Sequence, residues 1–393
     1  MKHYIKLFLL LSIFTTACKH KNQPRFDEVV KIKIELKKSN QTDVSQILKN
    51  IELIPLETTE KSVFGEVKRI RANDSYLYIL DYNNNPIKMF NKKNGKFVSE
   101  IGHKGAGPGE YVQITDFLIN NDTIYIFAWN GNKKWIRYSS DNQFLYETSM
   151  SFPFSEICLI GDNRYIVHVG NGTVSTESDY YLYNIDKNFG VLSKLMPKKS
   201  PEDINFPIQQ NHFSKTEEHI LYIREYCDTL FTISQDFTIH PKYHLDFGNN
   251  WCTKQFLKEY YDKPFFEIYN AIDKNEFVKH VNVWETNTQL IISYIIQHEI
   301  PLGKRGYDYL SIYFKETGEI YNYKNSRENI LTKLIIRPYW ADDSQITGLI
   351  SSEELLDIAD EISPDDPFAQ KIKKCAEQIN EFANPILVMC RFK

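Results

Sequence analysis

A short repeat of a polar turn followed by an apolar strand recurs along the chain. In each copy the strand alternates apolar and polar positions, and its apolar residues are mainly Tyr, Ile and Leu. The six turns are Asn73-Asp74-Ser75, Asn121-Asp122-Thr123, Gly161-Asp162-Asn163, Glu217-Glu218-His219, Thr286-Asn287-Thr288 and Asp342-Asp343-Ser344. A period of two residues is typical of β-strands, in which successive side chains point to opposite faces.

The spacing of the six copies indicates a β-propeller. The gaps between the strands are 47, 41, 55, 70 and 56 residues, counted between Leu77, Ile124, Tyr165, Ile220, Leu290 and Ile346. A four-stranded blade takes about 40 to 50 residues, so the shorter gaps fit a bare blade and the longer ones require insertions. The first two copies also contain a hairpin turn, at Asn94-Gly95 and at Asp141-Asn142. We therefore predict an all-β protein, a six-bladed β-propeller with four-stranded blades.

Two segments depart from this pattern and predict helical insertions, near residues 253–275 and 352–382. The first carries apolar side chains at helical spacing, and the second begins with two acidic residues after an N-cap at Ser351 or Ser352. The chain then returns to an alternating strand at residues 385–392, which needs a partner. Residues 51–56 can supply it, and this pairing closes the ring and removes exposed strand edges.

The first residues have the features of an export signal. Lys2 and Lys6 precede an apolar run at residues 7–14. That run is shorter than the roughly 20 apolar residues that span a bilayer, but it has the length of a secretory signal. Small residues then precede Cys18 and resemble a bacterial lipobox, although Thr15 stands where the best examples have Leu.

These features divide the chain into three expected parts. We predict a signal peptide over residues 1–17, a tether and N-terminal segment over residues 18–45, and the propeller over residues 46–393. Cys18 would carry the lipid anchor, with palmitate among its acyl chains, and would hold the protein on the membrane. Ordinary cleavage after Ala17 without a lipid is the alternative.

The charge of the exported chain argues against nucleic acid as a partner. Removing residues 1–17 takes away Lys2 and Lys6 and no acid, so the formal net charge changes from −4 to −6. Nucleic-acid binding asks for a basic face, which a mildly acidic chain does not favour.

The cysteines beyond Cys18 do not suggest a zinc site, because none forms a CxxC pair. They are Cys158, Cys227, Cys252, Cys375 and Cys390. Cys158 and Cys390 lie inside apolar runs, and we interpret both as buried thiols. The sequence leaves open whether Cys227 and Cys252 form a disulfide.

Several motifs together resemble a known family, the exported six-bladed β-propeller lipoproteins of Bacteroidetes, which are related in architecture to NHL-repeat proteins. The matching motifs are residues 54–58 (IPLET), 101–111 (IGHKGAGPGEY), 348–350 (GLI) leading to 354–356 (ELL), and 384–388 (NPILV). The resemblance covers nearly the whole exported part and implies the fold and export more than an activity. In lipoproteins of this lineage an acidic run after the anchor favours display outside the cell. Lys19-His20-Lys21 stand in its place here, so we expect an outer-membrane lipoprotein that faces the periplasm. We also expect a monomer.

The glycine-rich loop at residues 102–111 is the most conspicuous candidate site. Its four glycines match neither the GxGxxG motif nor a P-loop. Pro108 and the β pattern that follows it also argue against a helix whose N-terminus could bind phosphate. We interpret the loop as the passage from the outer strand of one blade to the inner strand of the next. In the alternative reading, His103 and Glu110 face a ligand.

Metal chemistry has weaker support. His240 and His244 lie four residues apart in an expected strand, about 13 Å from each other, which is too far to share one ion. Six-bladed enzymes with a central calcium use acidic and amide side chains of inner strands. By position, the candidates for such a calcium site are Glu66, Asp116, Glu156 and Asn211.

Exposed aromatic residues are the remaining candidates. The five tryptophans lie beside polar or glycine-rich turns, and Trp129 and Trp340 are the two we expect to contact a ligand rather than a neighbouring blade. The leading hypothesis is a membrane-anchored propeller that binds or scaffolds a protein, peptide or glycan ligand. The alternative is a metal-assisted hydrolase or lyase with its site at the central channel.

Overall fold

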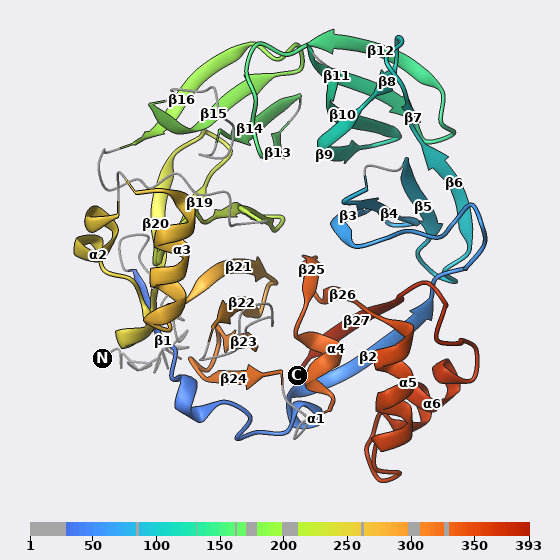
Figure 1. The fold of residues 1–393 in the computed structure, drawn as a ribbon, viewed down its shortest axis with the longest axis vertical. Helices are drawn as coiled ribbons and strands as arrows, with labels where there is room; N and C mark the ends of the chain where they lie inside the picture. Colours follow the sequence, from blue (N-terminus) through green and yellow to red (C-terminus); the bar gives the residue numbers. More distant parts are fainter. Residues whose placement is uncertain are drawn as a thin grey trace, which may run out of the picture.

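The computed structural model describes residues 29–83, 86–130, 132–161, 163–169, 179–198, 211–260, 263–297, 307–325 and 330–393. Within these residues, six antiparallel sheets are arranged around a central channel as the blades of a propeller (Figure 1). The six-bladed β-propeller predicted from the sequence is therefore confirmed.

The first three blades each contain four strands, which follow chain order from the channel to the rim. Blade 1 consists of β3 (Val67–Ala72), β4 (Tyr76–Asp81), β5 (Ile87–Asn91) and β6 (Phe97–Ile101). Blade 2 consists of β9 (Gln113–Asn120), β10 (Thr123–Asn130), β11 (Asn132–Ser139) and β12 (Phe144–Ser149). Blade 3 consists of β13 (Glu156–Gly161), β14 (Arg164–His168), β15 (Tyr180–Asp186) and β16 (Val191–Pro197).

The other three blades repeat this order, with additions from the N-terminal region. Blade 4 consists of β17 (Phe213–Lys215), β18 (Ile220–Tyr222), β19 (Thr229–Ile233), β20 (Ile239–Asp246) and the added β1 (Val30–Lys33). Blade 5 consists of β21 (Lys279–Glu285), β22 (Gln289–Ile296), β23 (Tyr307–Phe314) and β24 (Ile320–Lys324). Blade 6 consists of β25 (Pro338–Ala341), β26 (Ile346–Ile350), β27 (Ile386–Phe392) and β2 (Leu48–Pro55).

The six polar turns of the repeat occupy the same place in every blade, between its first and second strands. The strand after the turn does not alternate apolar and polar positions as predicted; it is apolar on both faces, because blades pack face to face. In β4, Leu77 and Ile79 join a core shared with Leu387 of blade 6, whereas Tyr78 and Leu80 join a core shared with blade 2. Burial of both faces explains why these second strands are rich in Tyr, Ile and Leu.

The ring is closed by strands from the two ends of the chain. β2 pairs antiparallel with β27, with Ile51 opposite Cys390 and Leu53 opposite Val388. The predicted pairing of an N-terminal strand with residues 385–392 is confirmed. β2 forms the rim of blade 6, so the blade is built from both ends of the sequence (Figure 1).

The later part of the predicted tether and N-terminal segment, residues 18–45, contains a strand and a 3-10 turn. β1 pairs in parallel with β20 and adds a fifth strand to the rim of blade 4. A 3-10 turn (Leu36–Lys38) and helix α1 (Val44–Ile47) then lead to β2. Ile32 and Ile34 are buried against blades 4 and 5, so this part of the chain packs on the propeller.

Helices lie outside the sheets, and both predicted insertions are present. Helices α2 (Lys254–Glu259) and α3 (Phe265–Lys274) fall between blades 4 and 5, and α4 (Thr332–Ile335) precedes blade 6. Helices α5 (Ser352–Glu361) and α6 (Ala369–Ala376) lie between β26 and β27. Ser351 is the N-cap of α5, and its side chain accepts a hydrogen bond from the backbone N–H of Glu354.

The five described cysteines are all buried free thiols, so Cys227 and Cys252 do not form a disulfide. Burial of Cys158 and Cys390 agrees with the sequence prediction.

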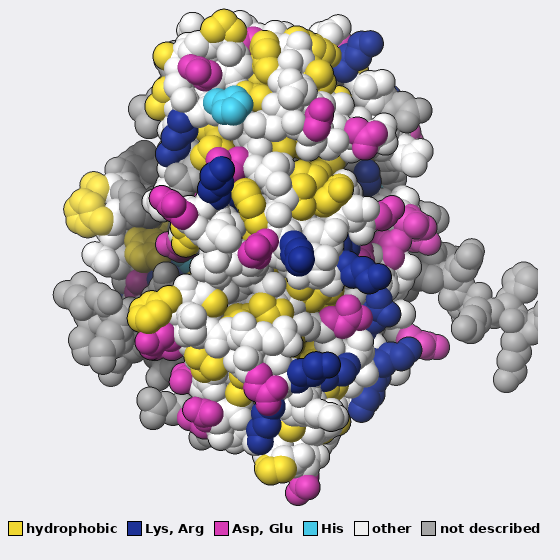
Figure 2. Space-filling view, turned by 90° about the vertical axis from the view of Figure 1, so that its right-hand side faces the viewer, with side chains coloured by type: hydrophobic (Ala, Val, Ile, Leu, Met, Phe, Trp, Pro, Cys, Tyr) yellow, Lys and Arg dark blue, Asp and Glu magenta, His cyan; other side chains and the backbone are white. Residues whose placement is uncertain are grey.

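Among the described residues, no helix has the length and hydropathy needed to cross a bilayer. Figure 2 shows one side of the molecule, where side chains of both charges are interspersed with small apolar areas.

Candidate functional site

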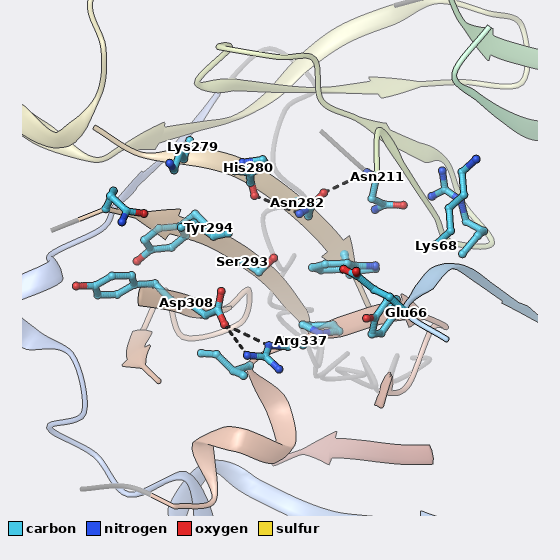
Figure 3. A pocket seen from close by; sticks show the side chains of 18 of the residues that line it. Glu66, Lys68, Asn211, Lys279, His280, Asn282, Ser293, Tyr294, Asp308 and Arg337 are labelled. Atoms are coloured by element: carbon cyan, nitrogen blue, oxygen red, sulfur yellow. Dashed lines mark hydrogen bonds and ion pairs between the residues drawn. The ribbon is translucent and has the colours of Figure 1, made fainter. Parts of the chain in front are cut away.

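A pocket of about 720 Å³ opens at one mouth of the central channel. Its walls come from the starts of the inner strands β3, β21 and β25, from Asn211 just before β17, and from helix α3. Side chains from several blades therefore meet in one pocket, as Figure 3 shows. Its volume lies within the range of about 300–1,000 Å³ that is usual for small-ligand sites.

Two ion pairs line this pocket. Arg337 donates from Nε and Nη2 to Oδ2 of Asp308, at 3.2 and 3.1 Å, and the dashed lines of Figure 3 mark these bonds. Lys279 pairs with Asp273 of α3, and its ammonium lies 4.1 Å from the ring centroid of Tyr269. In each of these two pairs the charge of one side chain compensates that of the other.

Two asparagines join blades 4 and 5 in the pocket wall. Asn282 accepts a hydrogen bond from the backbone N–H of Asn211 at 3.1 Å and donates to the carbonyl of His280 at 3.1 Å. Asn211 in turn donates to the carbonyl of Val283 at 3.1 Å. His280 lies in the left-handed region, with φ 54°, at an irregularity between β21 and β22. For a residue other than glycine this conformation costs about 1–3 kcal/mol, and such strain clusters at binding sites.

Deeper in the channel, two arginines engage two inner-strand carboxylates. Arg69 contacts Asp116 at 3.2 Å and Glu156 at 3.2 Å, and Arg71 contacts Asp116 at 3.0 Å. Burial raises the pKa of Glu156 although Arg69 opposes this shift. Burial by itself would lower the pKa of Arg69, but Glu156 and Asp116 reverse the shift and raise it. Asp116 and Glu156, two of the calcium candidates, therefore already have cationic partners.

The other two calcium candidates lie in the pocket at the channel mouth. Asn211 is part of the asparagine pair, and Glu66 lines the same pocket just before β3. Trp284 lines both the pocket and the deeper channel, and its indole N–H has no hydrogen-bond partner among the described residues.

A second polar cluster is buried between blades 3 and 4. His168 ends β14, His212 precedes β17 and Glu225 follows β18, and their nearest side-chain ligand atoms all lie within 4.8 Å of one another. Burial and the adjacent His168 lower the pKa of His212 to about 3. Burial alone would raise the pKa of Glu225, but the two imidazoles outweigh it and bring that pKa to about 2.

The four ligand-contact candidates from the sequence do not form one site. His103 and Glu110 lie in the outer connection between β6 and β9, where they pair as the short strands β7 (His103–Lys104) and β8 (Glu110–Tyr111). Trp129 is 45% exposed at the end of β10, and Trp340 lines the deeper channel beneath the ammonium of Lys92. Cys18 falls outside the described residues.

The residues of the pocket and of the buried cluster were largely missed from the sequence. Lys279 and Asn282 lie on β21, Asp308 lies on β23 and Arg337 directly precedes β25, so no single spacing along the chain connects them. The same holds for His168, His212 and Glu225. The sequence could have pointed to some of these residues only through their positions near the ends of inner strands or just after second strands.

Comparisons with known proteins agree with this architecture. A protein of Bacteroides fragilis that is inferred to be exported has a similar solved structure, with 22% identity and a TM-score of 0.78 over 93% of this chain and 100% of that one. A member of the DUF4221 family from Bacteroides vulgatus matches with 12% identity and a TM-score of 0.53 over 88% and 97% of the two chains. At these identities the likeness shows the fold alone. No curated protein matches the sequence significantly. A family model described as a domain of unknown function, DUF4934, matches residues 27–391, so the chain belongs to the DUF4934 family.

Proposed function

We propose that this protein is an exported binding module, anchored to the membrane through Cys18, that holds a short polar ligand at the mouth of its channel. The pocket of about 720 Å³ carries the proposal, since it brings amides, rings and paired charges from several blades together. The exported character of the similar Bacteroides fragilis protein supports a location in the cell envelope.

The side chains in the pocket suit a glycan unit or a peptide segment. Hydroxyl and amide groups of such ligands bond to asparagine, to paired carboxylates and to guanidinium groups, and their apolar faces pack on aromatic rings. Asn282, Asp308 and Arg337 supply the polar groups, and Tyr339 supplies a half-buried ring. Each of these groups is already held by the protein, which lowers the entropy cost of binding.

Binding is better supported than catalysis at the channel. A metal-assisted hydrolase or lyase of the expected kind needs several free carboxylates that converge on one ion. Asp116 and Glu156 instead share Arg69, and their charges are compensated.

A blocking variant tests the location of the site. Ser293 lines the pocket on β22, and Ser293→Phe fills space there without removing an ion pair. Purified protein is screened against a glycan array and a random peptide library, and the best hit is titrated by calorimetry. We expect the variant to bind that hit at least about tenfold more weakly, with an unchanged melting temperature.

Trp129→Ala and His103→Ala are the matched controls, since both residues lie outside the pocket. They should bind the hit as the wild type does. If a control loses binding while Ser293→Phe keeps it, the site lies on the rim and the proposal is wrong. Chemical conversion of the hit during the titration would favour the enzyme instead.

A further inference from the structure

The buried cluster of His168, His212 and Glu225 has the construction of a metal site. His168 and Glu225 each leave one polar atom, Nε2 and Oε2, without a hydrogen-bond partner among the described residues. All three side chains are at least nine-tenths buried, with 0, 2 and 9% of the residue exposed. Unpartnered polar atoms this deep in a protein are costly and call for a bound group.

Each of the two imidazoles is oriented by a hydrogen-bond contact at its Nδ1 atom. Nδ1 of His212 lies 3.1 Å from the carbonyl oxygen of Ile223, and Nδ1 of His168 lies 2.9 Å from the hydroxyl of Tyr222. The two rings stack with centroids 3.7 Å apart, so that each Nε2 faces the carboxylate of Glu225. Metal-binding histidines are held in this way, by a hydrogen bond from the nitrogen that does not bind the ion.

The partner of Nδ1 leaves Nε2 of His212 as the ring nitrogen that can bind an ion. A carbonyl oxygen can only accept a hydrogen bond, so Nδ1 of His212 carries a proton. Nε2 of the same ring faces an oxygen of Glu225 at 3.6 Å. The nitrogen and the oxygen are therefore placed to bind the same ion.

The distances also fit a shared ion better than direct hydrogen bonds. Oε1 of Glu225 lies 3.5 Å from Nε2 of His168 and 3.6 Å from Nε2 of His212. Strong hydrogen bonds between these atoms would measure about 2.7–3.2 Å. Ligands bound tetrahedrally to zinc at about 2.0–2.1 Å lie about 3.3 Å from one another.

We propose that His168, His212 and Glu225 bind a divalent transition-metal ion and that zinc is the ion this ligand set favours. Two imidazoles and one carboxylate suit zinc, and hard ions such as magnesium and calcium prefer oxygen ligands alone.

The ion would join two blades next to the channel. His168 belongs to blade 3, whereas His212 and Glu225 flank strands of blade 4. The backbone N–H of His212 also donates to Glu156 at 2.6 Å, and Glu156 contacts Arg69 in the channel. Metal binding therefore stabilises the interface between blades 3 and 4 and fixes the wall of the channel.

The test measures metal directly. The full chain is stripped with EDTA, dialysed and titrated with Zn²⁺ in competition with a chromogenic chelator, and the bound metal is counted by mass spectrometry. We expect one Zn²⁺ per chain and a higher melting temperature with Zn²⁺ than with EDTA. Glu225→Gln and His212→Gln keep the side-chain volume and should bind Zn²⁺ more than about 100-fold more weakly, since each removes a direct ligand.

His240→Gln is the control, because His240 is an exposed histidine of β20 outside the cluster. It should bind Zn²⁺ as the wild type does. Co²⁺ added to stripped wild type should give the visible absorption of four-coordinate cobalt, which Glu225→Gln lacks. The proposal is overturned if stripped wild-type protein takes up no stoichiometric metal. In that case a proton shared between His168 and Glu225 would explain their contact. It is equally overturned if Glu225→Gln and His212→Gln bind Zn²⁺ as tightly as wild type.

Discussion

Single residues stabilise this fold most visibly where a charge is buried between blades. Glu285, at the end of β21, is fully buried and contacts His219 at 2.8 Å, Lys242 at 2.9 Å and Lys315 at 2.7 Å. The hydroxyl of Tyr243 donates to the same carboxylate at 3.1 Å. Burial alone would raise the pKa of Glu285, but the hydrogen bond from His219 and the two lysines hold it well below its ordinary value of 4.5.

Glu285→Gln should therefore destabilise the protein at neutral pH by about 3 kcal/mol, as expected when one partner of a buried ion pair is removed. A carboxyl group whose pKa is lowered in the folded state stabilises that state above its unfolded pKa. The stabilisation is lost as the pH falls from about 4.5 toward the lower folded pKa. Urea unfolding at pH 7, 5.5 and 4 measures it. Glu217→Gln, at an exposed position, is the control. The assignment would be contradicted if the difference in free energy of unfolding between wild type and Glu285→Gln became larger below pH 4.5.

At the scale of the elements, the closing strand holds the first and last blades together. Leu387 of β27 is fully buried and shares a core with Leu77 and Ile79 of blade 1. Leu387→Ala should cost about 3 kcal/mol in free energy of unfolding, because it opens a cavity at the junction of the ring. Leu145 on β12 is 48% exposed, and Leu145→Ala should change that free energy by less than about 0.5 kcal/mol. Equal effects in a urea titration would mean that the junction does not stabilise the ring.

The glycine-rich loop is the second element whose role can be tested. Gly109 has φ 75°, and a Cβ on it would lie 2.7 Å from the ring of Phe144. Gly107 needs no positive φ, and a Cβ there would meet only the movable carboxylate of Glu110, at 3.0 Å. Gly109→Val should therefore lower stability by at least about 1–3 kcal/mol, and Gly107→Val by less.

Thermal unfolding of the two valine variants beside His103→Ala tests this order. His103 is exposed, so its variant should melt as the wild type does. Glu110 accepts a hydrogen bond from the backbone N–H of Gly107 at 2.8 Å, so Glu110→Ala should cost about 1 kcal/mol. Normal melting of Gly109→Val together with loss of a ligand would identify the loop as a binding site.

At the scale of the whole molecule, the proposed anchor decides where the channel mouth can meet a ligand. Growth with a fatty-acid analogue should label the wild type and leave Cys18→Ser unlabelled, because only the thiol accepts the lipid. The variant should also appear in the soluble envelope fraction. Label retained on Cys18→Ser would disprove the anchor, and ready digestion by protease added to intact cells would contradict a periplasmic orientation.

Much of the fold could be predicted from the sequence because its causes are local. Six turns such as Asn73-Asp74-Ser75 are followed by strands that bury both faces, and this pattern repeats at the length of a blade. The N-cap at Ser351 and the terminal strand at Ile386–Phe392 also depend on neighbouring residues and on period. The strand β1 was not predicted, since its parallel pairing with β20 joins segments more than 200 residues apart.

The candidate sites depended on tertiary structure. Asp308 and Arg337 lie 29 residues apart, and His168 and Glu225 lie in different blades, so their meeting is set by how the blades close around the channel. The sequence alone determined that the chain forms turns and strands of blade length, because turn chemistry and short apolar runs act between neighbours. Only the closed ring decided which side chains share a pocket, since long-range packing brings distant strand ends to one point and the spacing along the chain carries no record of it.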